Sequence, residues 1–173
     1  MTSLPDHLER YLGEIKRGWS RDADGRAVPF QIVECRGGML DGTTAYSTLG
    51  LSREPLVSAT SGKVIRHELV MITATNDDPG SIPGLLQQLG SEAIERGHPY
   101  LAGEVVGPRG RLFTGSAMEG VYFLPPVYWP DGFGQVEDET GQSVVVAWCL
   151  PITAKEAHFV RERGRDAFED ILA

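Results

Sequence analysis

The chain has 173 residues, of which 41% are hydrophobic and 23% charged, values typical of one globular domain over residues 1–173 with a sizeable core. Its formal net charge of -8 and pI of about 5.0 argue against binding nucleic acid over a broad surface, because such binding requires positive charge. This charge suits a basic protein partner, although solubility alone also explains an acidic surface.

The N-terminus has neither the basic stretch nor the apolar segment of a signal peptide, and no apolar run approaches the roughly 20 residues that span a bilayer. We therefore expect a cytoplasmic protein that does not enter a membrane. Cys35 and Cys149 lie in apolar, strand-like runs and in no CxxC motif. They predict free thiols and give no support for a zinc or redox site.

The first part of the chain predicts one helix followed by three strands. Apolar residues recur with helical spacing from Leu4 to Ile15, Ser3 stands at a capping position, and Gly18 closes the pattern. A polar, turn-forming loop then precedes runs rich in β-branched and aromatic residues. The loop and the three predicted strands occupy residues 20–26, 28–35, 43–51 and 65–75.

The middle of the chain predicts a second helix and then weaker structure. A polar turn at 76–80 is followed by a helix that Ser81 caps and Gly97 ends. Residues 100–120 show only a weak pattern, which indicates short strands and loops. A short strand at 121–124 is stopped by two prolines.

The C-terminal part contains the clearest local signals. The run from Val144 to Leu150 is too apolar for an edge strand and too short for a membrane span, so it predicts a central strand. Thr153 and Glu156 form a capping box, with Ile152 at the position of a hydrophobic staple. A helical segment broken by Gly164 completes the chain.

The predicted order of elements is α-β-β-β-α-β-β-α. This order favours an α+β fold, a single-domain sandwich of helices on a mixed, mostly antiparallel β-sheet. No internal repeat or linker divides the chain. No feature of the sequence predicts an oligomeric state.

Four segments in the same order resemble the bacterial Suppressor-of-fused-like (SUFU) domain family, from about residue 43 to the C-terminus. They are a "Y.T.GLS" strand end, an "R.EL" strand, a leucine-containing helix leading to a strand closed by two prolines, and a "PIT..E" helix start followed by Gly. In this chain they correspond to Tyr46–Ser52, Arg66–Val70, Leu85–Leu89 with Phe123–Pro126, and Leu150–Glu156 with Gly164.

The resemblance implies protein binding and no catalytic centre. The animal member is a two-domain regulator that sequesters a transcription factor, and bacterial members look like immunity proteins that neutralise polymorphic toxins. We therefore expect a stoichiometric protein-binding module, in the first place an immunity protein that covers the basic active-site cleft of a cognate toxin domain. A regulatory adaptor protein is an alternative that the same resemblance allows.

The residues themselves give little support for enzymatic chemistry. The four histidines have no metal-ligand spacing, and the chain lacks nucleotide-binding and nucleophile-elbow motifs, so we predict no metal, cofactor or catalytic residues. Glu34, Glu68 and Glu104 could nevertheless converge, which leaves a small ligand-binding or enzymatic domain as an alternative. Glu68 beside Arg66 is equally explained by a structural ion pair.

The long loop at 127–142 is the candidate binding surface. It combines aromatic and acidic side chains, and no Lys or Arg occurs between Arg111 and Lys155. Aromatic side chains beside acids are typical of a binding surface for a basic partner. Alternatively, the aromatics pack on the core and the acids are simply solvated. The predicted protein-binding residues are Tyr128, Trp129, Asp131, Glu137, Asp138 and Glu139.

Overall fold

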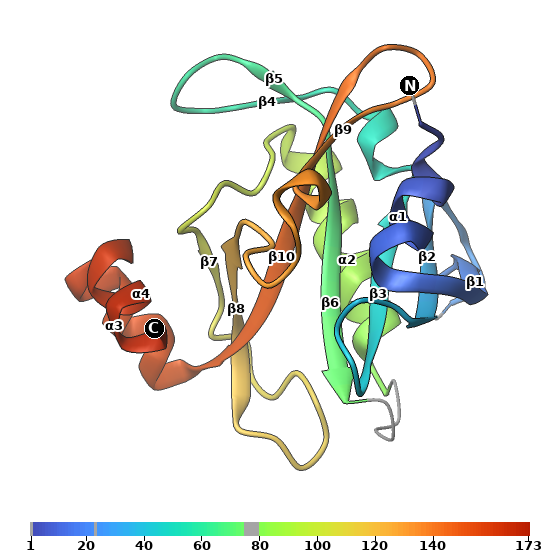
Figure 1. The fold of residues 1–173 in the computed structure, drawn as a ribbon. Helices are drawn as coiled ribbons and strands as arrows, with labels where there is room; N and C mark the ends of the chain where they lie inside the picture. The colour runs from blue at the N-terminus through green and yellow to red at the C-terminus, as the bar shows by residue number, and fades with distance from the viewer. Residues whose placement is uncertain (1, 23, 75–79) are drawn as a thin grey trace.

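A large mixed sheet with helices on both faces forms the centre of the molecule (Figure 1). The computed structural model describes residues 2–22, 24–74 and 80–173, so Thr75 and residues 76–79 of the predicted turn lie outside it. The strand order is β1-β2-β3-β6-β10-β8-β7, and β9 also pairs with β10. The strands of this sheet are β1 (Gly13–Arg21), β2 (Ala27–Gly37), β3 (Thr43–Leu49), β6 (His67–Ala74), β7 (Val105–Val106), β8 (Met118–Leu124), β9 (Gln135–Glu137) and β10 (Ser143–Thr153).

The sheet is mostly antiparallel, and only β6 and β10 run parallel. This arrangement confirms the predicted α+β fold and the central position of the apolar C-terminal strand. A separate hairpin joins β4 (Leu56–Val57) to β5 (Val64–Ile65). The helices are α1 (Leu4–Leu12), α2 (Ile82–Arg96), α3 (Ala154–Arg163) and α4 (Arg165–Leu172), with 3-10 turns η1 (Leu51–Arg53) and η2 (Asp131–Phe133).

Two apolar cores lie on opposite faces of the sheet. In Figure 1, α1 lies in front of the sheet and α2 behind it. Successive β10 residues alternate between the cores, because neighbouring side chains of a strand point to opposite faces. Trp148 joins the core beneath α1, α3 and α4, whereas Cys149 joins the core beneath α2. No helix of the described residues is long and apolar enough to cross a membrane.

The N-terminal segment differs from the prediction. Helix α1 ends at Leu12, and residues up to Arg21 form β1, so the predicted continuation of the helix to Ile15 and the first two residues of the predicted loop were wrong. Asp22 and residues 24–26 lie between β1 and β2, as the predicted loop requires. A register shift between Ile15 and Arg17 interrupts the strand alternation. As a result, Ile15 and Trp19 contact opposite cores, although in a regular strand residues four apart would lie on the same face.

The predicted helix caps are mostly confirmed. Ser3 accepts a hydrogen bond of 3.2 Å from the Asp6 backbone N–H, and Thr153 and Glu156 make both bonds of the capping box. Gly164 separates α3 from α4 with a φ of 89°, a conformation that favours glycine. Ser81 stands at the cap position of α2, but its hydroxyl donates to the Leu112 carbonyl oxygen at 2.6 Å.

Both cysteines are free and buried, as predicted. Cys35 lies in the α1-side core and Cys149 in the α2-side core. Burial raises the pKa of the Cys35 thiol to about 12, with smaller contributions from the charges of Glu9 and Glu34. Burial also raises the pKa of Cys149. Both therefore act as small apolar side chains.

Candidate functional site

Tyr128 and Trp129, in the segment between β8 and β10, differ in their exposure to solvent. Tyr128 is 65% exposed, and its ring centroid lies 4.9 Å from that of Trp148 in β10. Trp129 is 5% exposed and packs edge-on against the same Trp148 ring at 5.8 Å. Trp129 therefore belongs to the core, and Tyr128 is the aromatic side chain that a partner can reach.

The acidic residues of this segment are mostly at the surface. Asp131, at the start of η2, is exposed, as are Glu137 at the end of β9 and Glu139 in the following turn. None of the ion pairs of the described residues involves these three carboxylates. Their charges are therefore available to a basic partner.

Asp138 has a structural role in the turn between β9 and β10. Its Oδ1 atom accepts hydrogen bonds from the Thr140 hydroxyl at 2.7 Å, the Thr140 backbone N–H at 2.8 Å and the Gln142 backbone N–H at 3.0 Å. The hydrogen bond from the Thr140 side chain is the largest contribution that lowers the pKa of Asp138. The carboxylate both shapes the turn and adds to its negative charge.

Glu68 is fully buried and binds the start of η1. Its Oε1 atom accepts from the Thr48 hydroxyl at 2.6 Å and the Leu51 N–H at 3.2 Å. Its Oε2 atom accepts from the Gly50 N–H at 3.0 Å, the Ser52 N–H at 3.1 Å and the Ser52 hydroxyl at 2.6 Å. Burial raises the pKa of Glu68, and these hydrogen bonds oppose the rise. The ionised carboxylate satisfies all five donors, because three of them are backbone N–H groups that can only donate.

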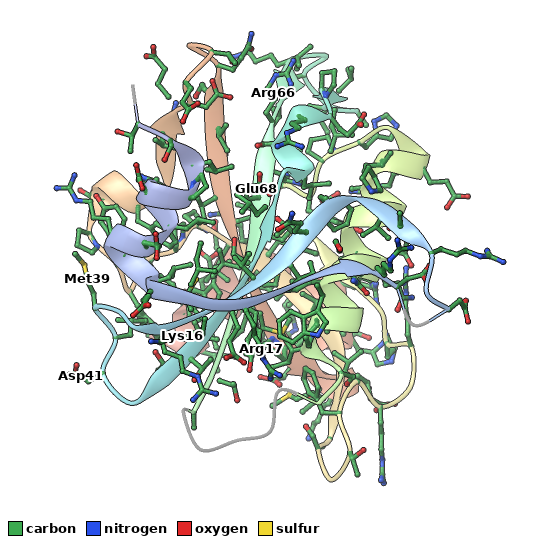
Figure 2. All side chains as sticks on the ribbon, turned by 90° about the vertical axis from the view of Figure 1, so that its right-hand side faces the viewer. Lys16, Arg17, Met39, Asp41, Arg66 and Glu68 are labelled. Carbon is green, nitrogen blue, oxygen red and sulfur yellow. The ribbon has the colours of Figure 1, made fainter. Side chains whose placement is uncertain are left out.

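Arg66 binds the other end of the same turn. Its Nη1 atom donates to the Ser52 carbonyl oxygen at 3.1 Å and to that of Arg53 at 2.9 Å. Glu68 therefore binds the N–H groups at the start of η1, and Arg66 binds the carbonyl groups at its end. This orientation is favourable, because the helix dipole attracts a negative charge to the N-terminus and a positive charge to the C-terminus. Instead of pairing with each other, Arg66 and Glu68 hold this turn at the upper end of the sheet, where Figure 2 shows both side chains.

The three glutamates considered for catalysis have separate sets of partners. Glu34 lies between Arg17 and Arg36, with Nη2–Oε1 and Nε–Oε2 distances of 3.2 Å each, and it also accepts from the Tyr46 hydroxyl. Glu104 accepts from the Leu101 N–H at 2.7 Å and lies 3.6 Å from Arg96. These contacts and those of Glu68 share no residue. Within the described residues, no group of His, Cys, Asp and Glu side chains could hold a metal ion.

His67 is a buried neutral histidine of the α2-side core. Its Nε2 atom accepts from the Tyr100 backbone N–H at 3.1 Å, so the ring proton lies on Nδ1, which has no hydrogen-bond partner among the described residues. Burial lowers the pKa of His67 to about 4. The ring stacks near that of Tyr100, with centroids 6.1 Å apart. These contacts hold the His67 ring in the core, where its role is structural.

Sequence reasoning missed the Glu68 and Arg66 contacts with η1. The donors for Glu68 are 16 to 20 residues earlier in the chain, so no local spacing reveals them. The signal that could have found them is a glutamate within an otherwise apolar strand. A buried carboxylate needs hydrogen-bond donors, and the glycine-containing turn after β3 supplies backbone N–H groups.

Comparison with known proteins gives a consistent family assignment. A family model for the Suppressor of fused protein (SUFU) matches residues 26–173. A search of curated protein sequences finds no match. A SUFU homolog from Neisseria gonorrhoeae has a similar structure, with a TM-score of 0.72 and 19% sequence identity over 95% of this chain and 84% of that chain.

Two further solved structures have the same fold. The Sufu-Fu complex matches with a TM-score of 0.70 and 16% identity, covering 98% of this chain and 82% of that chain. Drosophila Suppressor of Fused matches with a TM-score of 0.62 and 18% identity over 83% of this chain. The match covers only 38% of the Drosophila chain.

Proposed function

Because the chain belongs to the Suppressor of fused protein (SUFU) family, we propose that it is a non-catalytic module that binds a protein partner stoichiometrically. One solved structure with this fold, the Sufu-Fu complex, contains a family member bound to another protein. The separate partner sets of Glu34, Glu68 and Glu104 favour binding over catalysis, because acid–base chemistry on one substrate requires groups that meet.

The observation that carries the proposal is that Tyr128 and the carboxylates of the same segment are accessible to solvent. We call Tyr128, Asp131, Glu137, Asp138 and Glu139 together the acidic aromatic surface. The Tyr128 ring packs on Trp148, which in turn contacts the buried Trp129 ring. Because its position is already restricted, Tyr128 loses little side-chain entropy when it binds a partner. The exposed aromatic residue of this segment supplies area that a partner can bury, and its carboxylates attract positive charge. Residues 112–154 contain no Lys or Arg, so no cation of this segment opposes a basic partner.

We propose further that the partner is a cognate toxin domain and that the chain is its immunity protein. The resemblance to bacterial members of the family supports this choice, and so does the net charge of -8, which suits a basic active-site cleft. Attraction between the charges would accelerate association, and burial of Tyr128 would slow dissociation. A cytoplasmic location is part of the proposal, and the two free thiols support it.

The experiment uses the polypeptides encoded by neighbouring genes, among which the proposal expects a toxin domain, and measures binding kinetics at low and high salt. Tyr128→Ala should raise the dissociation rate roughly 30-fold if this residue is a hot spot of about 2 kcal/mol. Neutralising the four acids of the surface should slow association, and the effect should shrink at high salt. A control with the same change in charge neutralises four exposed acids elsewhere, namely Glu95, Glu162, Asp166 and Asp170.

The control variant should associate at a rate closer to that of the wild type than the surface variant does. Val64→Ala is the matched control for Tyr128→Ala, because Val64 is 60% exposed on the β4–β5 hairpin, outside the proposed surface. Equal binding by the surface variants and the wild type would refute this surface as the interface. Failure of every neighbouring polypeptide to bind would refute the immunity function.

A further inference from the structure

A groove of about 540 Å³ opens at the upper end of the sheet, next to the acidic aromatic surface. The start of α1, the opening residues of β2, η1 and the β9–β10 turn form most of its lining, with Ser20 of β1 and Leu49 of β3. Its volume lies within the range of ligand-binding pockets. Its lining combines apolar side chains such as Leu4 and Leu49 with hydroxyl, carboxylate and backbone groups.

The floor of the groove is a stretch of strand without regular neighbours. The β1–β2 register passes from Trp19↔Ile32 to Arg21↔Ala27, so residues 28–31 of β2 lie opposite the single residue Ser20. On the other side of β2, pairing with β3 begins only at Gln31↔Leu49. Residues 28–30 therefore have no registered partner on either side. Unpaired strand backbone is a template for another extended chain.

The two walls of the groove differ in charge, and hydrogen bonds hold both of them. The η1 wall includes Ser52 and Arg53, and the contacts of Glu68 and Arg66 hold it in place. On the wall formed by the β9–β10 turn, Asp138 is fixed by its own hydrogen bonds, and the adjacent Glu139 is exposed. The groove thus has a prearranged shape, with carboxylates on one side.

We infer that this groove binds an extended segment of the protein partner that carries a Lys or Arg side chain. The inference rests on the proposed function and specifies which part of the partner binds in the groove. The segment's backbone hydrogen bonds with the N–H and C=O groups of Val28 and Phe30, which point to the same edge of the strand, as in other cases where a peptide extends a sheet. Pro29 between them has no N–H group. Its basic side chain lies against Glu139 and Asp138, and its apolar side chains contact Leu4 and Leu49.

Selection from a random linear heptapeptide library on the wild-type protein tests the inference without the toxin. Enriched peptides should contain Lys or Arg and should shift the backbone amide NMR signals of Val28, Phe30 and Glu139. Glu139→Lys should weaken their binding about tenfold, as loss and reversal of a charged contact does. Glu162→Lys makes the same charge change on an exposed face of α3 and should leave binding within about twofold.

A second variant blocks the groove instead of changing its charge. Gln31 is exposed and lines the groove. The larger side chain of Gln31→Trp fills the groove, so this variant should abolish peptide binding. NMR spectra of both variants verify that they fold. Failure to enrich any peptide, or enriched peptides that bind both variants as tightly as the wild type, would overturn the inference.

The toxin domain then separates this inference from the proposed function. If the toxin domain binds Glu139→Lys and Gln31→Trp as tightly as the wild type, the groove is not used and the inference fails, while the proposed function stands. If peptides bind the groove and no neighbouring polypeptide binds the protein, the immunity function fails, and the groove remains a site for a basic segment of another protein.

Discussion

Replacing Glu68 with Gln tests whether a buried carboxylate holds the turn beside the groove. The amide has the shape of the carboxylate but presents an NH₂ group to donors. If nitrogen takes the place of Oε1, the Leu51 N–H loses its acceptor, and if it takes the place of Oε2, the N–H groups of Gly50 and Ser52 lose theirs. Each stranded buried N–H costs about 1–3 kcal/mol, and the remaining bonds lose their charge-assisted strength.

We therefore expect Glu68→Gln to lower the free energy of unfolding by about 3 kcal/mol. For a chain of this length, that corresponds to a Tm decrease of roughly 6–12 °C. Chemical denaturation at pH 7 measures the change, and amide hydrogen exchange should show faster opening of residues 50–53. Glu14→Gln, at an exposed position of β1, is the control and should change stability by less than about 0.5 kcal/mol. A change below about 1 kcal/mol in Glu68→Gln would refute the ionised state argued for this carboxyl group.

Three other predictions concern the core. Trp148→Ala should cost about 3–5 kcal/mol, because it removes a buried aromatic residue of the central strand, and an unchanged Tm would contradict this. Thiol titration should find Cys35 and Cys149 unreactive in the native protein and both reactive after unfolding without reductant, whereas thiols that appear only with reductant would show a disulfide. His67 has a pKa of about 4 when folded and an ordinary value of 6.5, so the unfolded state binds more protons between these values. Stability should fall by up to about 3 kcal/mol as the pH decreases from 6.5 to 4, and His67→Leu should lack this part of the pH dependence, so an equal pH slope would contradict the prediction.

The predictable parts of the fold are those whose signals are local. The apolar run of β10 and the capping box of α3 depend on residues close together in the chain, and both were predicted correctly. Strand β1 was missed because Ile15 continues the helical spacing of Tyr11 and Leu12, and because a bulge near Lys16 interrupts the alternation typical of a strand. Such an irregularity exists only in relation to the partner strand, which the pattern of β1 itself does not contain.

The geometry of the candidate site could not be predicted from the sequence, and its role in binding stays a prediction. Acidic and aromatic residues at 127–142 indicated a binding surface, yet an irregular segment has no periodicity to show that Trp129 is buried and Tyr128 exposed. The groove depends on the register of three strands. The role of Glu68 depends on a turn that precedes it by 16 to 20 residues.

Titration of toxin activity with the purified protein tests stoichiometric binding most directly. The toxin domain that the proposed function requires is held at a concentration far above the dissociation constant, and its activity is measured as increasing amounts of this chain are added. The proposed function predicts a linear loss of activity that is complete at one equivalent, with full activity recovered when the complex is dissociated. Full toxin activity at a large excess of the chain would contradict stoichiometric neutralisation, and so would lasting inactivation by a small fraction of an equivalent.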